Sequence, residues 1–310
     1  MRHLVEVRLT RYFRKPLFWI AFVLCLGIGI ICGIKCYQRL LDYDAYPILS
    51  FPMESSWIIA VLWIQTVLIS LEIGRDFYEG TLRQKLIVGH TKTKLFLADA
   101  FAAIIVTFCL SVLALLPIGI GGYIFFTHIP TEYAVKWFLV VLLSMCAMSI
   151  LPVMLSYLIG NRAIGVVASF CLMFCVCLAD DYISGYYFWD TVVGNVGYKA
   201  YQEIVENGET RYEPYLSPNP SYLEGTEKTL VYTLYTLAPY CGIPDALDYC
   251  VVLHPEWEEK GADWPGYFAQ VNQYRIFTQK RINMDLHTIL GVYVLYTAAG
   301  VMLFRRKNIK

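Results

Sequence analysis

The sequence predicts an all-α polytopic membrane protein with six transmembrane helices, and three observations support this fold class. Of the 310 residues, 57% are hydrophobic and only 16% are charged, whereas soluble domains carry about 25% charged residues. Six stretches lack Asp, Glu, Lys and Arg over the length of about 20 residues that a bilayer requires. Basic residues gather in the short segments between these stretches. The composition excludes a soluble globule and a disordered chain, and a net charge of zero gives no indication of a nucleic-acid binder.

The six predicted spans cover residues 17–34, 55–71, 100–126, 137–160, 163–179 and 286–304. A soluble helix of this length carries charges on the face that meets water, and these stretches carry none. The third span is longer than a bilayer requires and contains Pro117, so we expect its helix either to bend there or to end early. The first exceeds the apolar region of a signal peptide and no small-residue cleavage site follows it, which indicates a retained anchor.

The distribution of charge predicts the side of the membrane on which each loop lies. Six spans place both termini on one side, together with the 72–99 loop and Arg162. That side holds 15 of the 25 basic and 5 of the 25 acidic residues, which leaves 10 basic and 20 acidic residues on the other side. Short loops rich in Lys and Arg stay in the cytoplasm. We therefore expect both termini, including the basic tail 305–310, to be cytoplasmic.

The first 16 residues are predicted to form an amphipathic helix in the inner membrane interface, with its bases reaching toward lipid headgroups. The alternative is a frayed basic terminus. Pro16 marks a bend into the first span. Glu72, Asp99 and Arg162 lie at span ends, where we expect water or headgroups around them. The residues that define the two faces of the helix are Leu4, Val5, Leu9, Tyr12 and Phe13 on the apolar side, and Arg8, Arg11, Arg14 and Lys15 on the basic side.

Residues 180–285 form a 106-residue segment that we expect to be an extracellular, mainly helical and loop-rich cap. It holds 14 of the 24 tyrosines and many acids. Cys241 and Cys250 either form a disulfide, which the outer face permits, or remain two free thiols. An aromatic run follows the fifth span and is either an interfacial belt or an outer gate for cargo. Its residues are Tyr186, Tyr187, Phe188 and Trp189.

The sequence contains no signature of catalysis or of metal binding. It has no G-x-x-x-x-G-K-[ST] phosphate loop, no H-E-x-x-H zinc motif and no G-x-S-x-G nucleophile elbow, and its five histidines are scattered. We therefore expect that the chain is not an enzyme and holds no metal or cofactor of its own. The spans are nearly devoid of ionisable residues, which argues against an ion-coupled transporter.

The most informative segment follows the second span. Residues 76–88 read D-F-Y-E-G-T-L-R-Q-K-L-I-V, and we expect Leu82, Leu86 and Ile87 to share one face of a short helix. Gly89 is expected to end this helix. A short amphipathic helix in a cytoplasmic loop either lies on the inner leaflet or docks in a groove of another protein.

At these residues the sequence resembles the permease subunits of type-2 ABC exporters, the ABC-2 family. The resemblance rests on the acidic and then Gly-Thr motif in 76–82, on a Gly-x-[ST]-[KR] turn at 89–92, and on an Asn-Pro-x-Tyr…Gly-Thr stretch at 219–226. The order of an interfacial helix, six spans and an outer segment between the last two spans also matches. The outer segment is long for the family, and Cys241-Gly242 stands where Gly-Gln is usual.

The resemblance implies a permease subunit of an ATP-driven exporter in a bacterial plasma membrane. The chain would pair in the lipid bilayer with a second copy of itself or with a sister permease, and separate ABC ATPase subunits would bind ATP and Mg²⁺. Spans without buried charge suit an amphiphilic, peptide- or lipid-like substrate. The segment at about 76–88 would be the coupling helix that seats in the ATPase, with contacts from Asp76, Phe77, Glu79, Gly80, Thr81, Leu82, Arg83 and Leu86.

Two other classes of function stay open from the residues alone. A membrane-anchored receptor or structural protein acting through residues 180–285 would have no ATPase partner and would tolerate changes in 76–94. An integral-membrane enzyme would require a polar pocket near a membrane face, and the absence of clustered His or carboxylate residues in the spans argues against it.

Overall fold

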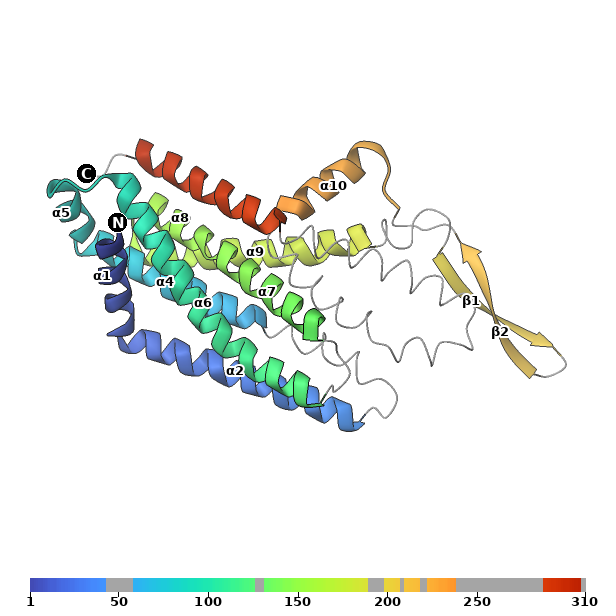
Figure 1. The fold of residues 1–310 in the computed structure, drawn as a ribbon. Coiled ribbons are helices and arrows are strands. Elements are labelled where there is room, and N and C mark those ends of the chain that lie inside the picture. The colour runs from blue at the N-terminus through green and yellow to red at the C-terminus, as the bar shows by residue number, and fades with distance from the viewer. Residues whose placement is uncertain are drawn as a thin grey trace.

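A computed structural model of the chain describes residues 1–42, 58–125, 131–188, 198–206, 209–217, 222–237 and 287–307. Helices lie side by side in a bundle, and a two-stranded hairpin lies beyond one end of it (Figure 1). The N-terminus, α5 and the end of the C-terminal helix (red in Figure 1) lie together at the opposite end. The elements are α1 (Arg2–Phe13), α2 (Pro16–Asp42), α4 (Ile58–Tyr78), α5 (Thr81–Ile87), α6 (Lys92–Phe125), α7 (Thr131–Met148), α8 (Ile150–Ile159), α9 (Arg162–Phe188), β1 (Tyr198–Glu206), β2 (Glu209–Ser217), α10 (Gly225–Leu237) and the C-terminal helix (His287–Arg306).

The described residues contain five helical segments that are long and apolar enough to cross a membrane, which supports a multi-pass helical membrane protein. They correspond to the first, third, fourth, fifth and sixth predicted spans. The predicted second span, 55–71, falls mostly in α4, which is not among the five and carries Glu72, Arg75 and Asp76 in its last two turns. The five segments are Pro16–Lys35, Lys92–Pro117, Phe138–Ile159, Arg162–Ala179 and His287–Arg306.

Two prolines have different effects on the predicted spans. α6 continues through Pro117 to Phe125, so the predicted early end of this helix is wrong. The fourth predicted span is instead divided, since α7 ends at Met148 and α8 begins at Ile150. Pro152 accounts for this break, because its ring clashes with the carbonyl four residues earlier and it has no N–H to donate. The Ser149 hydroxyl donates to the Cys146 carbonyl at 2.7 Å and so satisfies one acceptor at the end of α7.

The segment 180–285 departs from the all-α prediction. β1 and β2 pair as an antiparallel hairpin whose register runs from Tyr198 opposite Ser217 to Glu206 opposite Glu209. The prediction of a mainly helical and loop-rich cap did not include this hairpin. The signal was present in the sequence, because Asn-Gly at 207–208 is the dipeptide most typical of a two-residue hairpin loop. α10, which follows the hairpin, is helical and contacts α9.

Helices α2 and α6 pack with their backbones unusually close. A Cβ on Gly29 of α2 would overlap the carbonyl of Ala114 on α6, and a Cβ on Gly33 would lie 3.4 Å from the carbonyl oxygen of Pro117. Cys25 and Cys32 of the same helix are buried in the large apolar cluster that fills the bundle. Small residues allow membrane helices to approach each other in this way. The other glycine of this stretch, Gly27, has no neighbouring atom within 4 Å of its Cβ position.

This difference between Gly27 and Gly29 predicts that alanine substitutions at the two positions change the stability of the protein in different directions. Gly29→Ala should lower the thermal unfolding temperature in detergent, because overpacking against a backbone carbonyl costs about 1–3 kcal/mol. Gly27→Ala should leave it unchanged or raise it, because alanine is the better helix former by about 1 kcal/mol. Equal shifts for the two variants would contradict the close packing of α2 on α6.

Candidate functional site

The short helix α5 is held between two glycines with positive φ angles. Gly80 precedes it with φ of +68° and Gly89 follows it with φ of +102°. The N–H groups of Gly89 and His90 donate to the carbonyls of Leu86 and Lys85, both at 3.1 Å, which is the Schellman arrangement that ends a helix. The predicted role of Gly89 is thus confirmed. Because only glycine adopts these φ angles without strain, the sequence sets both ends of α5.

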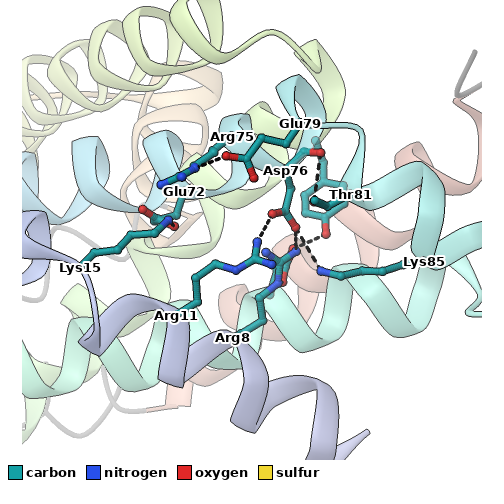
Figure 2. Close-up of polar contacts among 11 residues, drawn as sticks. Arg8, Arg11, Lys15, Glu72, Arg75, Asp76, Glu79, Thr81 and Lys85 are labelled. Atoms are coloured by element: carbon teal, nitrogen blue, oxygen red, sulfur yellow. Dashed lines mark hydrogen bonds and ion pairs between the residues drawn. The ribbon is translucent and has the colours of Figure 1, made fainter.

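Beneath α5, Asp76 at the end of α4 pairs with three cations from two other helices (Figure 2). Arg8 and Arg11 reach it from α1, and Lys85 of α5 lies 3.2 Å from its Oδ2. The carboxylate itself is fully buried. The Thr81 hydroxyl also donates to the Asp76 backbone carbonyl at 3.3 Å. The end of α4 and the start of α5 are therefore joined to α1 through one carboxylate.

Arg8 also joins this carboxylate to a second one, Asp99 of α6. Both oxygens of Asp99 face the guanidinium, with Arg8 Nη2 donating to Oδ2 at 2.7 Å and Nε lying against Oδ1. The hydroxyl of Tyr157 on α8 donates to the same Oδ2. Arg8 and Asp99 are 7% and 3% exposed at their side chains, so this is a buried ion pair. Planar guanidinium groups bind carboxylates in this two-pronged way with high geometric specificity.

Two further ion pairs flank the buried cluster. Lys15, at the junction of α1 and α2, pairs with the buried Glu72 of α4. Arg75 and Glu79 pair along the surface at the end of α4 (Figure 2). The surface pair contributes little because water screens it. The Lys15 pair adds a third connection between α1 and α4.

These contacts shift the pKa values of the groups outside the spans. Burial alone would raise the pKa of Asp76, but the charges of Arg8, Lys85 and Arg11 outweigh it and lower the pKa to about 2. Burial alone would lower the pKa of Arg8, and the nearby Asp99 and Asp76 carboxylates raise it above the ordinary value instead. The pKa of Lys85 is lowered by its burial and by the neighbouring Arg8 charge. Asp76 and Arg8 are therefore ionised at neutral pH.

The structure corrects the sequence interpretation of α1. Arg8, Arg11 and Lys15 do not reach toward headgroups, since all three point into the bundle and pair with carboxylates. Glu72 and Asp99, which we expected in water or among headgroups, are both buried. The physical reason is that each buried carboxylate needs a cation. Arg8 of α1 pairs with both Asp76 and Asp99, and Lys15, which follows α1, pairs with Glu72. Arg14, by contrast, is exposed.

The structure also divides the predicted coupling residues into an inner and an outer group. Leu82 is 1% exposed and packs in a buried apolar cluster with Ile73 and Leu95, and Leu86 lies against the same cluster. Ile87, expected on the face of Leu82, points the other way, because five residues turn a helix by about 140°. Leu82, Leu86 and Asp76 thus support α5 from within.

The outer face of this segment consists of residues that the sequence interpretation undervalued. Tyr78, Ile87 and Val88 are 82%, 76% and 79% exposed. Arg83, Glu79 and Gln84 are exposed beside them. The run of three apolar residues at 86–88 was the available signal, because three consecutive positions cannot all lie on one side of a helix. The outer face of this segment therefore combines three exposed apolar residues with the charged side chains of Glu79 and Arg83.

Of the remaining predicted residues, Phe77 lies well within the described chain, and the others lie at or beyond its edge. Phe77 is half-buried, and its ring lies edge-on to Tyr157 with centroids 5.6 Å apart. Tyr186, Tyr187 and Phe188 are in the last turn of α9, and Trp189, Cys241 and Cys250 lie outside the described residues. In the part of the chain that the structure describes, no three His, Cys, Asp or Glu residues gather to hold a metal.

Comparison with models of known protein families gives no match, and comparison with curated proteins also finds no match for this chain.

Removing Arg8 should destabilise the protein far more than removing the exposed Arg14, which directly follows the same helix. Arg8→Met leaves Asp76 and Asp99 without their shared partner, and breaking one side of a buried pair costs about 3–5 kcal/mol. Arg14→Met, which changes the charge by the same amount at an exposed position, should change stability by less than about 0.5 kcal/mol. Unfolding in detergent measures the stability of both variants. Similar losses of stability in the two would show that the ion pairs of Arg8 contribute nothing specific.

The low pKa of Asp76 predicts how the cluster responds to acid. Because the folded pKa is about 2 and the usual value is 3.8, the stabilisation by Asp76 is fully present above about pH 4 and is lost as the pH falls toward 2. The difference amounts to about 2 kcal/mol. Wild type should therefore lose stability between pH 4 and 2 more steeply than Asp76→Asn. Parallel pH profiles of unfolding would contradict the ionised state of Asp76.

Proposed function

We propose that the chain is the permease subunit of an ATP-driven ABC exporter and that α5 is its coupling helix. The observation that carries the proposal is the construction of α5. Ile87 of α5 points outward beside Tyr78 at the end of α4 and Val88 just after α5. The inner side of α5 is fixed by Leu82 and by the Lys85–Asp76 pair. A helix that receives force from a partner needs both an accessible docking face and a rigid connection to the spans.

The ion pairs supply that connection. A displacement of α5 passes to α4 through Asp76, to α1 through Arg8 and Arg11, and to α6 through the Arg8–Asp99 pair. Tyr157 extends the connection to α8. Four membrane-embedded or membrane-adjacent helices thus respond to one surface helix. Closure of an ATPase dimer against α5 would tilt these helices and open a path between two permease subunits.

The proposal includes a membrane orientation. We place α5 and both termini in the cytoplasm of a bacterial cell, with six spans and with residues 180–285 on the outer side. The gathering of α1, α5 and the end of the C-terminal helix at one end of the bundle supports this (Figure 1). The bases at that end are those that the positive-inside rule assigns to the cytoplasm.

The partners follow from the same proposal. Separate ABC ATPase subunits bind ATP and Mg²⁺, and a second permease copy or a sister permease completes the translocation path. The cargo is an amphiphilic, peptide- or lipid-like molecule. An apolar groove of about 270 Å³ between α2, α4 and α9, lined by residues such as Leu24, Trp63 and Phe170, is compatible with acyl chains or apolar side chains.

The test is to search the genes beside that of this chain for one that encodes a Walker A motif, to coexpress its product with the chain, and to measure copurification and ATP hydrolysis. The double variant Ile87→Asp/Val88→Asp should weaken both by at least about tenfold, since loss of a central apolar anchor costs about 2 kcal/mol or more. Val7→Asp on α1 changes another exposed apolar residue and should leave both unchanged. Because Ile87 and Val88 are exposed, the variant should keep the wild-type unfolding temperature.

Two outcomes would overturn the proposal. One is that no ATPase copurifies with the wild-type chain, which would favour the receptor alternative acting through residues 180–285. The other is that the double variant binds and stimulates the ATPase as wild type does.

A further inference from the structure

The end of the C-terminal helix holds the end of α8 through one lysine. Lys307 Nζ donates to the carbonyls of Tyr157 and Leu158 at 3.0 and 2.8 Å. These are among the last carbonyls of α8, which have no partner within their own helix. A cation at this position is also favoured by the helix dipole. Gly160 makes room for it, because a Cβ there would lie 2.7 Å from Nζ.

The same ammonium group contacts the residue that leads into α5. Lys307 Nζ lies 5.1 Å from the centre of the Phe77 ring, within the range of a cation–π interaction. Phe77 is three residues before Gly80, where the chain turns into α5. Lys307 therefore holds the N-terminal side of the α5 loop against α8.

The C-terminal side of the loop is held by the same short stretch of chain. Lys92, the first residue of α6, donates to the carbonyls of Lys307 at 2.5 Å and of Arg305 at 3.4 Å. Arg305 Nε donates in return to the Thr93 hydroxyl at 3.0 Å. Residues 305–307 thus contact the chain immediately before α5 and shortly after it.

Aromatic packing fixes these contacts in place. The Tyr157 ring lies edge-on to Phe304 with centroids 4.5 Å apart and to Phe96 with centroids 5.3 Å apart. Phe96 in turn lies so close to Gly300 that a Cβ there would overlap its ring. The C-terminal helix is therefore seated on α6 and α8 in one position along its axis.

We propose that Lys307 is a positioning residue that, with Lys92, ties the position of the C-terminal helix to the orientation of α5. The α5 loop then has two supports, the ion pairs of α1 on one side and residues 305–307 on the other. A shift of the C-terminal helix would therefore reach α5 through the contacts of residues 305–307. The regulatory part of this inference rests on the proposed function of α5 as the ATPase-docking helix.

The first experiment uses the chain alone, so its result does not depend on any ATPase. Hydrogen exchange followed by mass spectrometry should show peptides within 77–92 exchanging at least about fivefold faster in Lys307→Met, because the loop loses one of its supports. Lys307→Arg should restore slow exchange, since it keeps the cation and its donors. Arg306→Met is the matched control, because Arg306 is exposed on the same turn and should have no effect.

Lys92→Met provides the second variant, since it removes the hydrogen bonds that the first residue of α6 donates to the carbonyls of Arg305 and Lys307. It should accelerate exchange in the same peptides. Wild-type exchange within 77–92 in both variants would overturn the proposal. Accelerated exchange that extends equally into α2 would also overturn it, because that pattern indicates general loosening rather than positioning of α5.

The second experiment uses the complex with the ATPase. Lys307→Met should still copurify, because Ile87 and Val88 are intact, and should reduce stimulated ATP hydrolysis about fivefold, with Lys307→Arg near wild type. Unchanged stimulation in Lys307→Met would overturn the regulatory part of the inference. Failure of the wild-type complex to form would instead refute the proposed function, and the exchange result on the isolated chain would still decide the structural part.

Discussion

The pairing of Arg8 with both Asp76 and Asp99 is the constraint on which this end of the molecule depends. A buried carboxylate without a cation costs several kcal/mol, so the ends of α4 and α6 can come together only while α1 lies across them. This makes α1 a part of the bundle. The direction in which α5 leaves α4 follows from the same contacts, because Lys85 of α5 shares Asp76 with Arg8.

Much of the fold could be predicted because its signals are local. Charge-free stretches located five of the segments that can cross a membrane, and Gly89 marked the end of α5. The break in the fourth span and the hairpin also had local signals, in Pro152 and in the Asn-Gly at 207–208, but hydropathy alone does not register them. The prediction of a helix within the sixteen residues before the first span is confirmed. The prediction that its bases reach toward headgroups is wrong for Arg8, Arg11 and Lys15, whose partners are carboxylates.

The site could be predicted only in part, because its contacts are between residues far apart in sequence. Arg8 and Asp99 are 91 residues apart, and Arg11 and Asp76 are 65 apart. A basic face on an amphipathic helix looks the same whether lipid phosphates or buried carboxylates neutralise it. Similarly, the periodicity of 82–88 reveals apolar residues without revealing which ones the chain itself covers. Leu82 was therefore expected to dock, whereas Ile87 and Val88 are the exposed residues.

The many contacts that hold α5 in place have a physical consequence for binding. A helix of seven residues is not stable alone in water, so its order comes from Leu82, the Asp76 pair, the two glycines and the contacts of Phe77 and Lys92. All of these hold the backbone while Tyr78, Ile87 and Val88 stay outside. A partner that binds this face meets a surface that is already ordered, and it avoids the entropy loss of fixing a flexible loop. Under the proposed function, the same rigidity would allow movement of the ATPase to reach the bundle, because a loop that bent on contact would absorb that movement.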